Sequence, residues 1–126
     1  MSQRSALAAI IGLALGATLV LAAGCATDSS VAPPVAPSNL IVAPLGGGAH
    51  LTWLDNSNDE IEFVIMRQQV GVDAAMQELA SVPFNGTQFH DEPVVAGATY
   101  IYQVIASNEA GETDSNQVMF KAPATP

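Results

Sequence analysis

Residues 94–111 of this 126-residue chain read VVAGATYIYQVIASNEAG, and this stretch decides the fold class. Its apolar residues recur at every second position, which is the spacing of side chains on one face of a β-strand. These positions are Tyr100, Tyr102, Val104 and Ala106. Residues that favour turns stand on both sides, at 96–97 and at 108–111. The stretch therefore predicts a long, half-buried strand between two turns.

The same alternation occurs in three earlier segments. Their expected inward-facing residues are Leu40 and Val42, Leu51 and Trp53, and Ile61, Phe63 and Ile65. Turn-forming residues separate the segments at 46–48, 55–59 and 85–86. Residues 72–80 contain good helix formers, but the strands on both sides favour another strand over 76–81. The pattern predicts an all-β sandwich of about seven strands.

Taken together, these motifs resemble a fibronectin type III domain over about residues 37–123. The residues that carry the resemblance are Pro37, Leu40, Trp53, Phe63, Ile65, Val94, Gly97, Tyr100, Tyr102, Val104, Ala106, Asn108 and Gly111. The resemblance implies an immunoglobulin-like sandwich at 38–123, with a core signature of Trp53, Phe63, Gly97, Tyr100 and Tyr102. Tyr100 is expected to bury its ring while its hydroxyl bonds the backbone at a tyrosine corner.

The first 24 residues have the pattern of a signal peptide. Arg4 precedes an uncharged apolar run from Ala6 to Ala23, and small residues lead from there into Cys25, the only cysteine of the chain. The sequence AAGC at 22–25 resembles the lipobox of bacterial lipoproteins. This resemblance implies cleavage after residue 24 and acylation of Cys25 by chains such as palmitate. An uncleaved membrane-spanning anchor and simple secretion are the alternatives.

Residues 25–37 would then form the lipidated N-terminus and a proline-rich linker. Three prolines and the absence of an apolar period in this segment predict a semi-rigid, extended spacer of about 35 Å. The lipobox resemblance implies an exported protein of the bacterial cell envelope. Because Ala26 rather than an aspartate follows the cysteine, the outer membrane or the cell surface is favoured.

The charge of the chain limits its partners. Three lysines and arginines oppose twelve acidic residues, which gives a net charge of −9. Such a chain is repelled by phosphate backbones, so nucleic acid is not an expected partner. It also lacks the basic clusters that hold proteins to anionic lipid. Membrane attachment is therefore expected through the lipid on Cys25 alone.

The sequence DNSNDE at 55–60 is the most acidic short run of the chain. Its alternating oxygen ligands suggest calcium, but an EF-hand is excluded because Glu60 stands where that loop requires glycine. We expect a solvated loop that offers Asp55, Asn56 and Asp59 for binding, and no metal.

No other motif indicates chemistry. His50 and His90 lie 40 residues apart with no second histidine at ligand spacing, so a zinc site would need carboxylates as well, and surface positions are expected for both. Asp91 and Glu92 are adjacent, and on a strand they would point to opposite faces. No nucleophile elbow or serine-histidine-carboxylate set is evident. The sequence predicts neither an enzyme nor a cofactor.

These observations favour a non-catalytic, lipid-anchored envelope module for protein or glycan binding, such as adhesion. The expected contact regions are the loops at 55–59, 82–88 and 108–113, or an exposed sheet edge. The alternative is a structural accessory or spacer subunit of a larger envelope complex.

Overall fold

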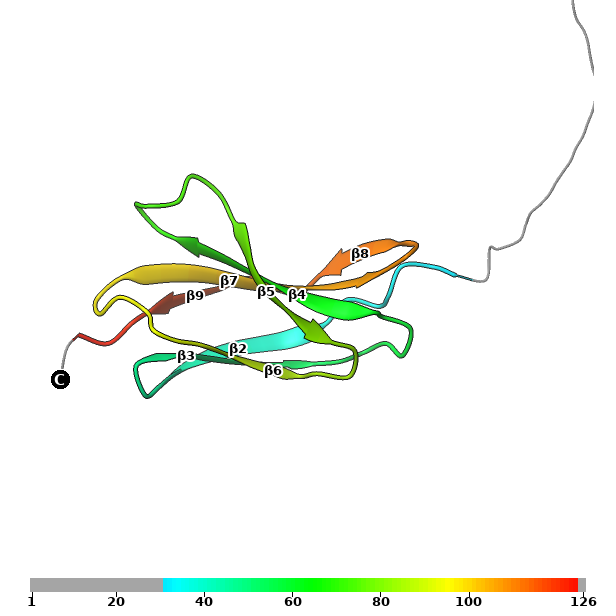
Figure 1. Cartoon of the computed structure of the whole chain (residues 1–126), viewed down its shortest axis with the longest axis horizontal. Helices are drawn as coiled ribbons and strands as arrows, with labels where there is room; N and C mark the ends of the chain where they lie inside the picture. The colour runs from blue at the N-terminus through cyan, green and yellow to red at the C-terminus, as the bar shows by residue number, and fades with distance from the viewer. Residues whose placement is uncertain (1–30, 125–126) are drawn as a thin grey trace, which may run out of the picture. The chain divides into compact units, whose positions relative to one another are not determined.

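The computed structural model describes residues 31–124, and a compact unit begins at Pro33 (Figure 1). Its strands are β2 (Ser38–Leu45), β3 (Gly48–Leu54), β4 (Glu62–Gln69), β5 (Gln77–Pro83), β6 (Gln88–Asp91), β7 (Thr99–Asn108), β8 (Gly111–Asp114) and β9 (Val118–Lys121). In the part of the chain that is described, no helix has the length and apolar character needed to cross a membrane. The expected leader at 1–24 and Cys25 lie outside the described residues.

The strands form two antiparallel sheets that stack in two layers (Figure 1). One sheet has the order β2-β3-β6, and the other has the order β5-β4-β7-β8, with β9 also paired to β7. The all-β sandwich predicted from the alternating pattern is confirmed. The strand expected over 76–81 is β5, and the residues before it form a turn in which Asp73 Oδ2 accepts a hydrogen bond from Gln69 N at 2.8 Å.

Eight strands occur in the described residues where about seven were expected, because the last strand is divided. Between β8 and β9, Ser115 N donates to Val104 O at 2.8 Å and Ser115 Oγ accepts from Val104 N at 2.9 Å. Next to it, Asn116 Oδ1 accepts from Leu40 N at 3.0 Å and Asn116 Nδ2 donates to Leu40 O at 3.2 Å. One amide side chain thus links the two sheets where β8 and β9 separate.

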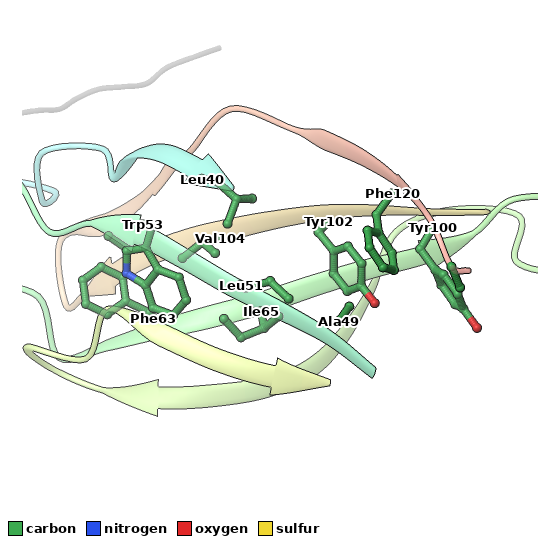
Figure 2. Close-up of a cluster of buried hydrophobic side chains, with 12 residues drawn as sticks. Leu40, Ala49, Leu51, Trp53, Phe63, Ile65, Tyr100, Tyr102, Val104 and Phe120 are labelled. Atoms are coloured by element: carbon green, nitrogen blue, oxygen red, sulfur yellow. The ribbon is translucent and has the colours of Figure 1, made fainter. Parts of the chain in front are cut away.

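The core lies between the sheets, and its side chains come from both of them (Figure 2). Its largest fully buried members are Tyr100, Tyr102, Phe63, Leu51, Ile65 and Val104. Trp53 is only 3% exposed and packs against Phe63 with ring centres 5.6 Å apart. Four signature residues that are expected inside, Trp53, Phe63, Tyr100 and Tyr102, are therefore buried.

The tyrosine corner forms between β6 and β7. The Tyr100 hydroxyl accepts a hydrogen bond from Val95 N at 2.8 Å, as expected. Gly97 adopts a φ of +78° and its N–H faces the carbonyls of Ala122 and Pro123 at 3.2 Å. A side chain at position 97 would be strained in this left-handed conformation.

The expectation that Ile61 faces the core is wrong, since this side chain is 56% exposed. The chain bends at residue 61, and the ladder of β4 starts only at Glu62. Alternation along a strand does not extend through a bend, so Phe63 and Ile65 are buried while Ile61 is not.

The end of the expected linker belongs to the folded unit. Pro34 and Pro37 are buried, and Asn56 Nδ2 donates to Ala36 O at 2.9 Å. The segment available as a spacer is therefore shorter than the predicted 25–37.

Candidate functional site

Three loops meet at the end of the sandwich where the N-terminal segment joins β2, and we call this the loop end. The loops are residues 55–61, 84–87 and 109–110, which connect β3 to β4, β5 to β6, and β7 to β8. Asn85 N donates to Glu60 Oε2 at 3.2 Å, and Asn108 Nδ2 donates to Asp59 O at 3.2 Å. The structure thus brings together the three loop regions that the sequence suggested for contact.

The loop at 55–59 is ordered by its own polar side chains. Asp55 Oδ1 accepts from Ser57 N at 3.1 Å, and the Ser57 hydroxyl donates to Asp59 Oδ1. Asn56 Nδ2 bonds Ala36 O and Ser38 Oγ, both at 2.9 Å, and so ties the loop to the entering chain. All three expected binding residues, Asp55, Asn56 and Asp59, make hydrogen bonds that order the loop, and all three border an open hollow of about 460 Å³.

Three large apolar side chains lie exposed at the loop end. Leu54 is 52% exposed, Ile61 56% and Phe84 61%. Ile61 and Phe84 flank the paired residues Glu62 and Pro83 at the end of the β4–β5 ladder. Exposed apolar groups that gather beside polar loops are typical of interaction surfaces. Phe84 lies within the expected contact region at 82–88, although it was not named there as a binding residue; an aromatic residue directly before the Asn85-Gly86 turn is a signal for it.

Glu60 is a residue that the sequence analysis missed, because it ends a run that was expected in solvent. It is 6% exposed, and its Oε2 accepts the bond from Asn85 N, whereas Oε1 has no partner among the described residues. This hydrogen bond from Asn85 to the Glu60 carboxylate holds the loops at 55–61 and 84–87 next to each other. Over residues 31–124, no group of three or more histidine, cysteine or acidic side chains is arranged to hold a metal ion.

The comparisons with known proteins agree with this architecture. No family model and no curated protein matches the sequence. Among solved structures, a domain of human collagen alpha-1(XX) described as fn3 is similar with a TM-score of 0.63 and 18% identity, over 79% of this chain and 93% of that chain. The sixth fibronectin type III domain of human fibronectin type III domain containing protein 3 gives a TM-score of 0.62 and 22% identity, over 76% and 92%. A structure described as a myokine gives 0.61 and 26%, over 71% and 98%.

The domain has the fibronectin type III fold. A polar cluster connects the two sheets of the domain. Arg67 Nη1 donates to Asp91 Oδ1 and Oδ2 at 3.2 and 3.0 Å, and the Tyr102 hydroxyl donates to Asp91 Oδ2 at 2.6 Å. The Arg67 guanidinium also lies over the Tyr100 ring, 5.4 Å from its centre. As expected for neighbours on a strand, Asp91 is buried while Glu92 is exposed.

Burial shapes the electrostatics of this cluster. Burial first, and then the hydrogen bond to Asp91, raises the pKa of the Tyr102 hydroxyl far above its usual value. Burial alone would lower the pKa of Arg67, but the hydrogen bond and charge of Asp91 raise it overall. Tyr102 therefore stays a donor and Arg67 stays a cation, so the cluster connects the sheets of the fibronectin type III domain rather than exchanging protons.

The opposite end of the fibronectin type III domain has a cleft of about 310 Å³. Its lining contains only glycine, alanine, valine and proline, from residues 46–48, 94, 96 and 122–124. No charged or hydroxyl side chain enters this lining. The loop end offers more chemistry for recognition than this cleft.

The two histidines are only partly buried, in keeping with the expected surface positions, and they are neighbours in space. His50 and His90 are directly opposite each other on β3 and β6, with ring centres 5.7 Å apart. The pairing of these two strands is non-local, and spacing in the sequence does not reveal it.

Proposed function

We propose that this chain is a non-catalytic, lipid-anchored module of the bacterial envelope that binds a protein or glycan partner through its loop end. The observation that carries the proposal is the exposure of Leu54, Ile61 and Phe84 beside the polar loop at 55–59. Exposed apolar side chains next to polar loops are typical of partner surfaces. The fibronectin type III fold of the domain is consistent with a binding or spacer module.

The loop end is also pre-organised for binding. Asn56, Glu60 and Asn108 each hydrogen-bond a different neighbouring segment, so the loops are held relative to one another before a partner arrives. Loops that are already ordered lose less conformational entropy on association. The order of the loops therefore favours a module that contacts a partner over a module that only acts as a spacer.

A photo-crosslinking amino acid at position 84 tests the contact surface. Phe84→benzoylphenylalanine in the native cell is expected to give a discrete adduct, because aromatic residues in the middle of such a patch carry much of the binding. The adduct is analysed by mass spectrometry, which separates a protein from a glycan partner. Met119→benzoylphenylalanine is the matched control, since Met119 is 69% exposed on β9, away from the loops. Equal adducts at both positions, or none at 84, would favour the spacer subunit.

Cys25→Ser tests the anchor. If acyl chains hold the protein, this variant moves from the membrane to the soluble fraction, because each buried methylene contributes about 0.8 kcal/mol to membrane binding. Fractionation followed by immunoblotting measures the change, and mass spectrometry of the native N-terminus detects the lipid. A Cys25→Ser protein that stays in the membrane at full length would show that a helix anchors the chain.

A further inference from the structure

The cross-strand histidine pair on the outer face of the three-stranded sheet is not used by the proposed function. His50 of β3 and His90 of β6 are register partners, and their rings are tilted by 45° with centres 5.7 Å apart. Both residues are half-buried, so the rings stand on the sheet surface within reach of solvent. These are the only two histidines of the chain.

Glu92 orients one of the two rings. Its Oε1 lies 2.8 Å from His90 Nε2. A carboxylate can only accept in this contact, so His90 carries its proton on Nε2 and leaves a lone pair on Nδ1 when it is neutral. Carboxylates hold metal-binding histidines in this way.

The backbone keeps Glu92 close to the pair. Gly48, two residues before His50, lies beside Glu92, and a Cβ at position 48 would be 2.3 Å from Asp91 O and 2.9 Å from Glu92 Cβ. Only glycine permits this approach.

The second observation is that one ring nitrogen of each histidine lacks a hydrogen-bond partner. His50 Nδ1 and His90 Nδ1 are both buried, and neither has a hydrogen-bond partner among the described residues. Two buried nitrogen atoms without partners are unfavourable as they stand. A cation that coordinated both would satisfy them together.

We propose that His50 and His90 chelate one divalent transition-metal ion, of the class of Zn²⁺ or Cu²⁺, with Glu92 as the group that orients His90. A metal–nitrogen bond of about 2.1 Å places an ion about 3.2 Å from each ring centre, so two rings that share it have centres about 5–6 Å apart. The observed 5.7 Å falls within this range. The protein provides two ligands and water fills the other positions, so the site needs no group of three metal-binding side chains, and none is found over residues 31–124.

Imidazole nitrogens select this class of ion over calcium or magnesium, which prefer oxygen. The net charge of −9 further favours the approach of a cation. The inference is independent of the loop end and of the anchor.

The test uses the full chain without an affinity tag, in detergent, with Cys25→Ser in every sample so that no thiol competes. Titration with ZnCl₂ in a calorimeter is expected to show one ion per chain. With CuCl₂, electron paramagnetic resonance is expected to show coupling to two imidazole nitrogens. His50→Gln and His90→Gln should each weaken binding by at least about tenfold, because loss of even an outer partner weakens metal sites about 10–100-fold. Glu92→Gln should weaken it about tenfold.

Thr52→Ala is the matched control, since Thr52 follows His50 on the same strand and face but offers no nitrogen. It should bind zinc as the parent does, and circular dichroism should show that all variants are folded. Unchanged affinity in both folded histidine variants would overturn the proposal. Equal weakening by Thr52→Ala, or a copper spectrum with fewer than two nitrogens, would overturn it as well.

Discussion

Trp53→Ala is expected to lower the free energy of unfolding by about 3–5 kcal/mol, the largest effect of any single core substitution proposed here. The indole is 3% exposed, lies at the end of β3 and packs on Phe63 across the two sheets. Its removal leaves a cavity that the surrounding strands fill only in part. Small domains have a stability of about 5–15 kcal/mol, so the variant loses a large share of its total. Urea unfolding followed by circular dichroism measures the loss.

Trp53→Phe measures the contribution of packing alone in the same unfolding experiment. The indole Nε1 has no hydrogen-bond partner among the described residues, so the phenylalanine variant forfeits volume but no hydrogen bond. We expect a loss of about 1–2 kcal/mol for it. Met119→Ala, at an exposed site, should change stability by less than about 0.5 kcal/mol. A Trp53→Ala loss no larger than that of the exposed control would contradict the burial of the indole.

Asp91→Ala is expected to cost about 2–4 kcal/mol, because it leaves the guanidinium of Arg67 and the hydroxyl of Tyr102 without their acceptor. Breaking a fully buried ion pair costs about 3–5 kcal/mol, and the lower range applies because the Arg67 side chain is 28% exposed. The Arg67 cation is retained after the change, since it cannot lose its proton. Urea unfolding at neutral pH measures the difference.

A double-mutant cycle assigns this loss to the cluster. Tyr102→Phe alone removes one hydrogen bond, and in the Asp91→Ala background it should cost less, with a coupling of about 0.5–3 kcal/mol. Arg67→Met combined with Asp91→Leu should recover part of the stability, because a buried ion pair can be replaced by apolar groups of similar volume. Additive losses of Asp91→Ala and Tyr102→Phe would show that the two residues do not act together.

The sequence predicts those parts of the fold in which apolar and polar residues alternate along a strand. Tyr100, Tyr102 and Val104 alternate over a long segment, and all are buried as expected. The tyrosine corner was expected from the resemblance to fibronectin type III domains, which rests on residues close together in the chain, from 94 to 100. The alternating pattern gave the wrong prediction for Ile61, because the chain bends at this residue, directly before β4 starts.

The parts that escaped prediction depend on strand pairing between distant residues. Asn116 bonds Leu40 across 76 positions, and Arg67 meets Asp91 across 24. Polar side chains carry no periodic signal, so a sequence does not show which of them will be enclosed between two sheets. The meeting of His50 and His90 has the same origin, since β3 and β6 are neighbours in one sheet although β4 and β5 lie between them in the chain. At the loop end, the acidic loop and the contact region at 82–88 were predictable from composition and turn residues, but the degree to which Phe84 is exposed was not.

The point at which the chain enters the domain affects how the anchored domain would meet a partner. Ala36 bonds Asn56, and Pro33 lies close to Gly111, so the polypeptide runs into the sandwich alongside the recognition loops. A tether attached upstream of this point would hold the domain by the end that carries the proposed contact loops. Under the proposed anchoring, the loops would stay close to the bilayer that holds the lipid. Lateral diffusion in that bilayer would then bring the domain and a membrane-bound partner together. Confinement to the same bilayer would raise the local concentration of such a partner, so even weak individual contacts would then be occupied.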